Sequence, residues 1–120
     1  MTATTVMRWA ALCLLVAGVL LALTAGGSRS VQAAGTRYAV TVVPGERVEV
    51  RVTSGVARAV TLAAVMPGMG HALPPVETVE AGPGRFVAAG PVFTMDGVWE
   101  LVVTVSGQRG EELITVTVLV

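Results

Sequence analysis

Six short runs rich in valine and threonine constrain the fold of this chain more than any other feature of its sequence. Turn sequences such as PG, SG, GPG, DG and SGQRG separate them. β-Branched residues favour strands, and closely spaced Gly and Pro favour the turns between strands. The runs cover residues 37–43, 46–53, 58–65, 85–93, 98–105 and 112–120. We therefore expect strands joined by turns, with no long helix after residue 30.

Apolar and polar residues alternate within these runs. Three valines alternate with three charged residues between positions 47 and 52, and Trp99, Leu101 and Val103 share a face opposite Glu100. This period of two is typical of strands with one buried face. Six or seven strands at intervals of about 8–12 residues predict an all-β fold, a small immunoglobulin-like antiparallel β-sandwich. We expect Trp99 and Phe93 to lie in its core.

An apolar block at residues 9–27 precedes the predicted strands, and residues 10–27 contain no charged side chain. Eighteen helical residues would reach roughly 27 Å, close to the hydrocarbon thickness of a membrane. The following sequence SVQAAG offers small residues for a signal-peptidase cut near Ala33. The block exceeds the ~7–15 residues of an ordinary signal sequence, which favours an uncleaved anchor with a cytoplasmic N-terminus.

With a cleaved signal peptide or an uncleaved anchor, the rest of the chain is expected outside the cytoplasm, either secreted or anchored in the cytoplasmic membrane. The predicted organisation is a signal-anchor or signal peptide at 1–34 and one β-sandwich domain at 35–120. The only cysteine, Cys13, lies in the apolar block, so the exported domain has neither a disulfide nor a thiolate metal site. The zero net charge gives no indication of a nucleic-acid partner.

The sequence MPGMGHALPP, at residues 66–75, is the strongest candidate for a functional site. It holds two of the three methionines that follow the apolar block, Met66 and Met69, together with the only histidine, His71. The third, Met95, precedes a DG turn and would join them if that turn lies at the same end of the sandwich. Thioethers with one imidazole form a soft donor set that favours Cu(I). The alternative is that Met66 and Met95 cap the core while His71 is a solvated loop residue.

The order MPGMGH, GPGRFVAAG and FTMDGVWELVVTV resembles the YtkA-like domain, which is related to FixH. The resemblance covers roughly residues 56–105, about half of the exported part. It implies a small extracytoplasmic β-sandwich concerned with copper handling or with the assembly of copper-containing oxidases. It also implies copper ligands at Met66, Met69, His71 and Met95, with Trp99 packing beneath the site.

Other chemistry has little support in the sequence. No Ser or Cys forms a recognisable nucleophilic arrangement with the one histidine, so we expect no enzymatic activity. Glu77 and Glu80 could form a carboxylate pair, but a solvated loop or strand edge explains them better. The expected function is an extracytoplasmic Cu(I) chaperone or accessory factor with a copper-protein or oxidase partner. The alternatives are a metal-free interaction module that contacts a membrane partner and, with less support, a sensor domain.

Overall fold

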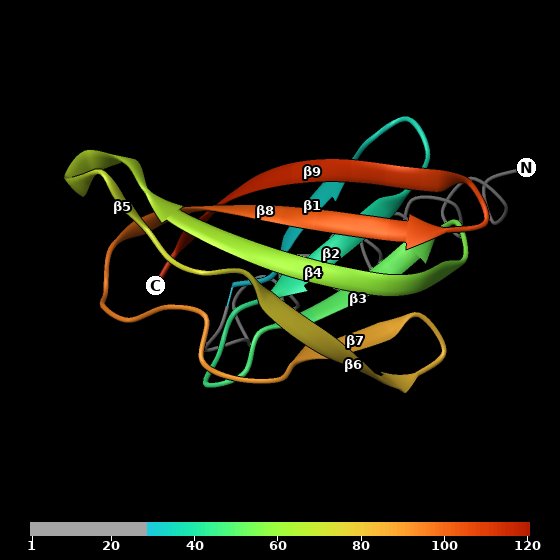
Figure 1. Ribbon diagram of the computed structural model, residues 1–120, viewed down its shortest axis with the longest axis horizontal. Coiled ribbons are helices and arrows are strands. Elements are labelled where there is room, and N and C mark those ends of the chain that lie inside the picture. The colour runs from blue at the N-terminus through green and yellow to red at the C-terminus, as the bar shows by residue number, and fades with distance from the viewer. Residues whose placement is uncertain (1–28) are drawn as a thin grey trace, which may run out of the picture.

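The computed structural model describes residues 29–120 and folds them into nine β-strands and one short 3-10 helix (Figure 1). The predicted anchor at residues 10–27 lies outside the described residues. In chain order the elements are β1 (Val31–Ala34), β2 (Ala39–Val43), β3 (Glu49–Ser54), β4 (Ala57–Met66), η1 (Pro67–Met69), β5 (His71–Ala72), β6 (Val76–Gly82), β7 (Arg85–Ala88), β8 (Val98–Gly107) and β9 (Gly110–Leu119). The described part of the chain is therefore all-β, as predicted.

The strands form two antiparallel layers that share one strand. The full order is β1-β2-β3-β7-β6-β4-β8-β9, with β5 attached to β4 beyond this path. Strand β6 joins the layers, because its first residues pair with β4 through Thr61 and Leu62 while the rest of the strand pairs with β7. Figure 1 shows the long strands β4, β8 and β9 in front of β1, β2 and β3. The fold is thus sandwich-like.

The core lies between the two layers and follows the predicted alternation. Trp99, Leu101 and Val103 of β8 are fully buried, whereas Glu100 is exposed. The valines at the inner positions of β2 and β3 face them from the other layer. Tyr38 and Phe86 are also core residues, which the sequence analysis did not single out, and Phe93 packs against the core only partly buried.

Three strands, β1, β5 and β6, were not among the six predicted runs, and one run is shorter than predicted. Strand β6 contains Glu77 and Glu80, and β1 uses four residues that the sequence assigns to the N-terminal segment. The predicted strand at 85–93 ends at Ala88, because Gly90 and Pro91 follow and a proline cannot donate a ladder hydrogen bond. The sheet therefore begins before the predicted boundary at residue 35.

The outer strands β1 and β9 are linked at one end of the molecule by Glu112. Its carboxylate accepts hydrogen bonds from the backbone N–H groups of Thr36, Arg37 and Tyr38 and from the Thr36 hydroxyl, at 2.9–3.1 Å. A Cβ at Gly35 would lie 2.0 Å from a Glu112 carboxylate oxygen, so only glycine permits this approach. We call this arrangement the Glu112 clamp.

No helix among residues 29–120 is long and apolar enough to cross a membrane.

Candidate metal site

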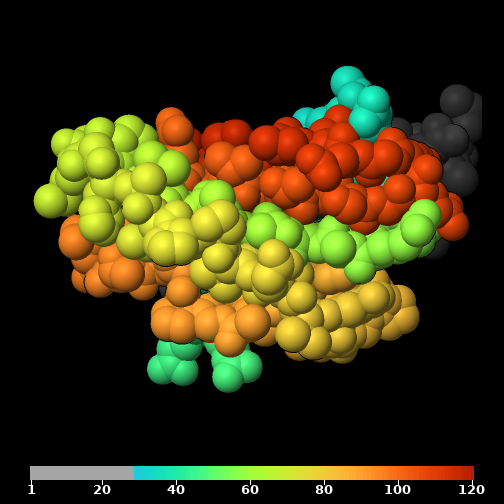
Figure 2. Space-filling view, in the orientation of Figure 1, coloured from blue at the N-terminus to red at the C-terminus, as the bar shows by residue number. Residues whose placement is uncertain are grey.

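The first three candidate ligands lie on a tight hairpin at the end opposite the Glu112 clamp. Strand β4 ends at Met66, η1 carries Met69, and β5 begins at His71. Gly70 makes the reversal with φ 59° and ψ 27°, in the left-handed region that glycine adopts without strain. Figure 2 shows this hairpin projecting at the left-hand end of the molecule. The sequence Met-Pro-Gly-Met-Gly-His therefore forms a tip at the end of a long strand.

Met66 and His71 are cross-strand partners, and this register sets the direction of their side chains. They occupy directly opposite positions in the antiparallel β4–β5 pair. Residues paired in this way point to the same face, with Cβ atoms about 4.5–5.5 Å apart. The imidazole ring of His71 lies 6.5 Å from the ring of Trp99, at an interplanar angle of 62°. The thioether and the imidazole are therefore neighbours on the side of the hairpin that faces Trp99.

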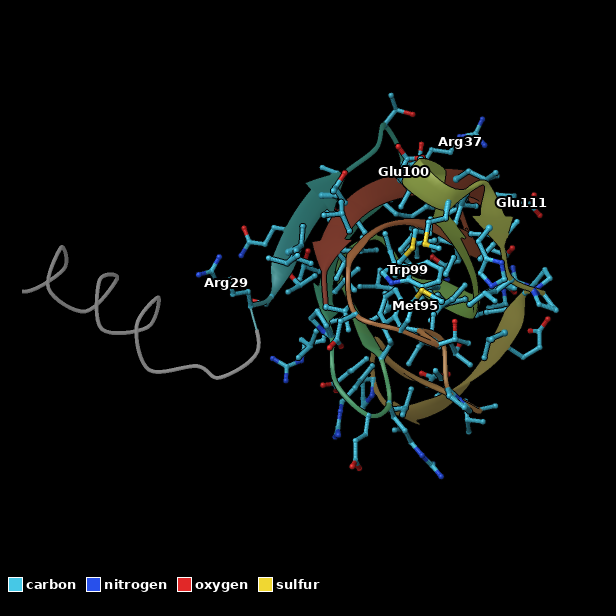
Figure 3. The ribbon with its side chains drawn as sticks, turned by 90° about the vertical axis from the view of Figure 1, so that its left-hand side faces the viewer. Arg29, Arg37, Met95, Trp99, Glu100 and Glu111 are labelled. Atoms are coloured by element: carbon cyan, nitrogen blue, oxygen red, sulfur yellow. The ribbon has the colours of Figure 1, made fainter. Side chains whose placement is uncertain are left out.

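Met95 comes to the same end through the segment that leads into β8. The Trp99 indole N–H donates a hydrogen bond of 3.1 Å to the Met95 carbonyl, which fixes this segment over the indole. The Phe93 ring lies 5.6 Å from the indole ring. Figure 3 looks at this end and shows Met95 beside Trp99, with the sulfur atoms gathered near the indole in this view. All four candidate ligands thus lie at one end of the sandwich, where Trp99 lies near the His71 ring and bonds the Met95 carbonyl.

The candidate ligands differ sharply in exposure. Met69 is 67% exposed and Met95 is 43% exposed, whereas Met66 is only 6% exposed. Met69 therefore lies outside the core, whereas Met66 is a core residue, as the alternative interpretation of the sequence expects for Met66. Met66 continues the inward alternation of β4, in which Leu62 and Ala64 are also buried.

Met66 also contacts the turn that follows Met95. A Cβ at Gly97 would lie 2.9 Å from the terminal methyl group of Met66, so this methyl packs where Gly97 has no side chain. Gly97 has a φ of 144°, which further favours glycine there. Met66 therefore joins the hairpin to the segment of Met95 by packing.

The chemistry of this end is that of thioethers and one imidazole. Among residues 29–120, no group of three or more His, Cys, Asp and Glu side chains is placed to hold a metal ion. Asp96 and Glu100 are the acidic residues of the segment around Met95, and both are exposed. Donor atoms at this end are therefore mainly soft sulfur atoms, which prefer Cu(I) to hard cations.

The other motifs occupy ordinary structural positions. Glu77 and Glu80 are exposed on β6, and the Thr61 hydroxyl donates a 3.3 Å hydrogen bond to Glu77. The GPG sequence forms the turn between β6 and β7, as expected. A shallow hollow of about 370 Å³ lies on β1, β2 and β3 and is lined by alanine, valine, threonine and glutamine. Its lining includes no titratable side chain.

The exposed apolar residues beside the candidate site were not predicted from the sequence. Val98 is 54% exposed and Leu119 is 66% exposed, and the two are cross-strand partners in β8 and β9. The alternation around Trp99 already places Val98 on the outward face, where polar residues are usual. A valine there could have indicated an exposed apolar surface.

No protein-family model, curated protein or solved structure matches this chain. The resemblance to the YtkA-like domain and the immunoglobulin-like shape therefore stay predictions.

Proposed function

We propose that this chain is an extracytoplasmic copper-binding protein that holds Cu(I) at the Met/His end of its sandwich. The observation that supports it most is the position of Met69 and Met95. Methionine is normally a core residue, yet these two are exposed at the same end as the only histidine. Exposed thioethers contribute little to folding, so a role in binding explains their position better than packing does.

The proposed ligands are Met66, Met69, His71 and Met95. The shared face of Met66 and His71 gives a sulfur and a nitrogen donor on one side of the hairpin. Met95 approaches from the facing segment, and Met69 lies on the tip. Because Met66 is buried, its sulfur would bind from the core side, while the exposed donors would make the first contact with the metal.

The proposed role follows from the resemblance and from the apolar block at residues 10–27. The domain would stand outside the cytoplasm behind an uncleaved membrane anchor, as a YtkA-like domain of immunoglobulin-like shape. It would act as a Cu(I) chaperone or accessory factor for copper homeostasis or oxidase assembly, without enzymatic activity. Its partner would be a copper protein or an oxidase.

A metal-free interaction module is the second candidate. The exposed apolar residues beside the site, Val98 and Leu119, favour it, because a partner could cover them whether or not copper binds. Copper affinity separates the two functions.

The test is an anaerobic titration of the full chain with Cu(I) in the presence of a chromophoric Cu(I) chelator. A Trp9→Phe background leaves Trp99 as the only tryptophan, so that its fluorescence reports binding beside the indole. We expect a one-to-one complex that competes with the chelator and quenches Trp99. Val79→Ala is a matched control, since Val79 is 63% exposed and lies on β6.

Binding that survives the combined replacement of Met69, His71 and Met95 would place copper elsewhere. An absence of binding at micromolar concentrations would leave the interaction module as the better proposal. Acidification provides an independent check, because an imidazole must be neutral to bind metal whereas a thioether carries no proton. Affinity should fall as the pH is lowered but level off, and His71→Ala should remove this dependence.

A further inference from the structure

Five exposed apolar residues surround the Met/His end, and we call them the apolar rim. They are Met69 (67% exposed), Met95 (43%), Val98 (54%), Leu119 (66%) and Val120 (39%). Val98 pairs with Leu119, and Gly97 and Val120 exchange two backbone hydrogen bonds of 2.9 and 3.0 Å. The rim therefore combines the end of β9, the start of β8 and the hairpin tip into one end of the molecule (Figure 1).

The charges around the rim make it unsuited to an acidic partner. The segments that form it, residues 66–72, 94–100 and 117–120, contain no Arg and no Lys. Their acidic residues are Asp96 and Glu100. Exposed apolar patches of this kind mark surfaces that meet a protein or a membrane.

The direction of β1 shows how the rim would face a membrane. Ala34 pairs with Ala39 next to the Glu112 clamp, so β1 runs toward the clamp and Val31 begins on the side of the rim. In the end-on view of Figure 3, Arg29 lies to one side of Met95 and Trp99. The chain therefore enters the fold from the half of the molecule that carries the rim.

The length of chain before β1 places the rim near the proposed anchor. Three residues, 28–30, separate the uncharged block at 10–27 from Val31. Three residues reach at most about 11 Å. If residues 10–27 span a bilayer, the entry side of the sandwich must lie at the surface of that bilayer. The apolar rim lies in the half of the molecule where the chain enters the fold, and its side chains are exposed.

We propose that the apolar rim docks on the lipid surface of the membrane that holds the anchor. This inference rests on the anchor in the proposed function, but not on copper binding. Docking would hold the Met/His site at the interface, where it would face membrane-embedded copper proteins. Because the rim has no basic residue, docking would rely on apolar burial and would not require anionic lipids.

The experiment compares two positions on one strand of the full chain, reconstituted in phosphatidylcholine vesicles. Leu119→Cys and Leu113→Cys, each in a Cys13→Ala background, are labelled with an environment-sensitive fluorophore. Both residues point outward from β9, at 66% and 62% exposure, but Leu113 lies toward the clamp end. Doxyl-labelled lipids then report contact with the acyl region. A Val98→Cys label provides a second position on the rim.

We expect a blue-shifted emission and at least about twofold stronger lipid quenching at positions 119 and 98 than at 113, and no strengthening by added anionic lipid. Equal quenching at 119 and 113 would overturn the proposal. A blue shift at 119 without lipid quenching would also overturn it, because a protein surface would then cover the rim. Copper titration of the same samples is read separately, so failure of docking and failure of copper binding are distinguishable.

Discussion

The two ends of this sandwich are built in opposite ways. At the clamp end, polar groups link strands that are far apart in the sequence. Glu112 holds the turn after β1, and the Tyr38 hydroxyl donates to the Gly110 carbonyl at 2.8 Å and accepts from the Arg109 backbone N–H at 3.0 Å. At the Met/His end, the Trp99 indole donates a hydrogen bond to the Met95 carbonyl, and the side chains of Met69 and Met95 are exposed.

This difference shows how the fold can separate stability from binding. At the clamp end, the Glu112 side chain ties the turn after β1 to β9 through hydrogen bonds to residues 36–38. Core packing up to Met66 and Trp99 supports the other end from beneath, so its exposed donors need not take part in folding. Substitutions should therefore affect stability and copper affinity separately, depending on the end that they change.

The largest expected effect is the loss of stability on replacing Met66, the buried methionine of the Met/His end. Met66→Ala should lower the free energy of unfolding by about 2–5 kcal/mol, because it removes core volume at a buried site. Urea unfolding followed by circular dichroism measures it. Met66→Leu, which keeps the volume, should cost less than about 1.5 kcal/mol. A loss below about 0.5 kcal/mol in Met66→Ala would show that this end is not packed as described.

At the clamp end, Tyr38→Phe should cost about 1–3 kcal/mol, because it leaves the Gly110 carbonyl and the Arg109 N–H without their partner while keeping the buried ring. The same urea measurement applies, and copper affinity should stay unchanged. A matching loss of copper affinity would contradict the separation of the two ends.

The clamp should also make the protein sensitive to acid. Removal from water alone would raise the pKa of Glu112, but hydrogen bonds from the Thr36 hydroxyl and from three backbone N–H groups lower the pKa below the ordinary 4.5. A depressed pKa gives stability that is complete above pH 4.5 and is lost as the pH falls through the lower folded value. Thermal melts of wild type should therefore lose stability below pH 4.5.

Glu112→Gln should be less stable at neutral pH, and its melting temperature should fall less between pH 5 and pH 3 than that of wild type. Glu49 must be taken into account, because its pKa is lowered as well. Desolvation would raise its pKa, but the hydrogen bond from Arg85 and the charges of Arg51 and Arg85 lower it. Glu49 therefore also loses its contribution to stability as the pH falls. Parallel pH profiles for wild type and Glu112→Gln would exclude the clamp as the acid-sensitive element.

The smallest expected change in stability is at the exposed tip. Met69→Ala should alter the free energy of unfolding by less than about 0.5 kcal/mol, because the side chain is 67% exposed. Copper affinity should nevertheless fall by about tenfold or more, since a soft ligand is lost. Chelator competition and urea unfolding on the same preparation measure both. Unchanged affinity would remove Met69 from the site.

Local sequence patterns were enough to predict six of the nine described strands and the inward face of most of those six. The alternation at residues 47–52 and in β8 identified Val48, Val50 and Leu101 as core residues, because a period of two follows from strand geometry alone. The same rule, extended along β4 from Leu62, would have placed Met66 inside. The proline and glycines that follow Met66 indicate a turn, so the alternation was not extended to Met66.

Long-range pairings could not be predicted in the same way. The six runs do not reveal that β6 passes from one layer to the other, or that residues 31–34 form an edge strand. Glu112 could not be distinguished from any exposed glutamate, since its partners lie about 75 positions earlier in the chain. Contacts of this kind depend on which strand edges meet, and a local sequence window does not contain that information.

The sequence by itself determined six of the nine described strands, most of the turns, the turn sequence after Met66 and the chemical types of the candidate donors. These depend on backbone preferences and side-chain chemistry, which are properties of single residues and their neighbours. The tertiary structure decided that Trp99 lies near the His71 ring and bonds the Met95 carbonyl, that Met66 is buried, and that Val98 and Leu119 extend the same end. Burial and proximity arise only when strands distant in sequence pack together, because the partners that exclude water from a side chain come from other parts of the chain.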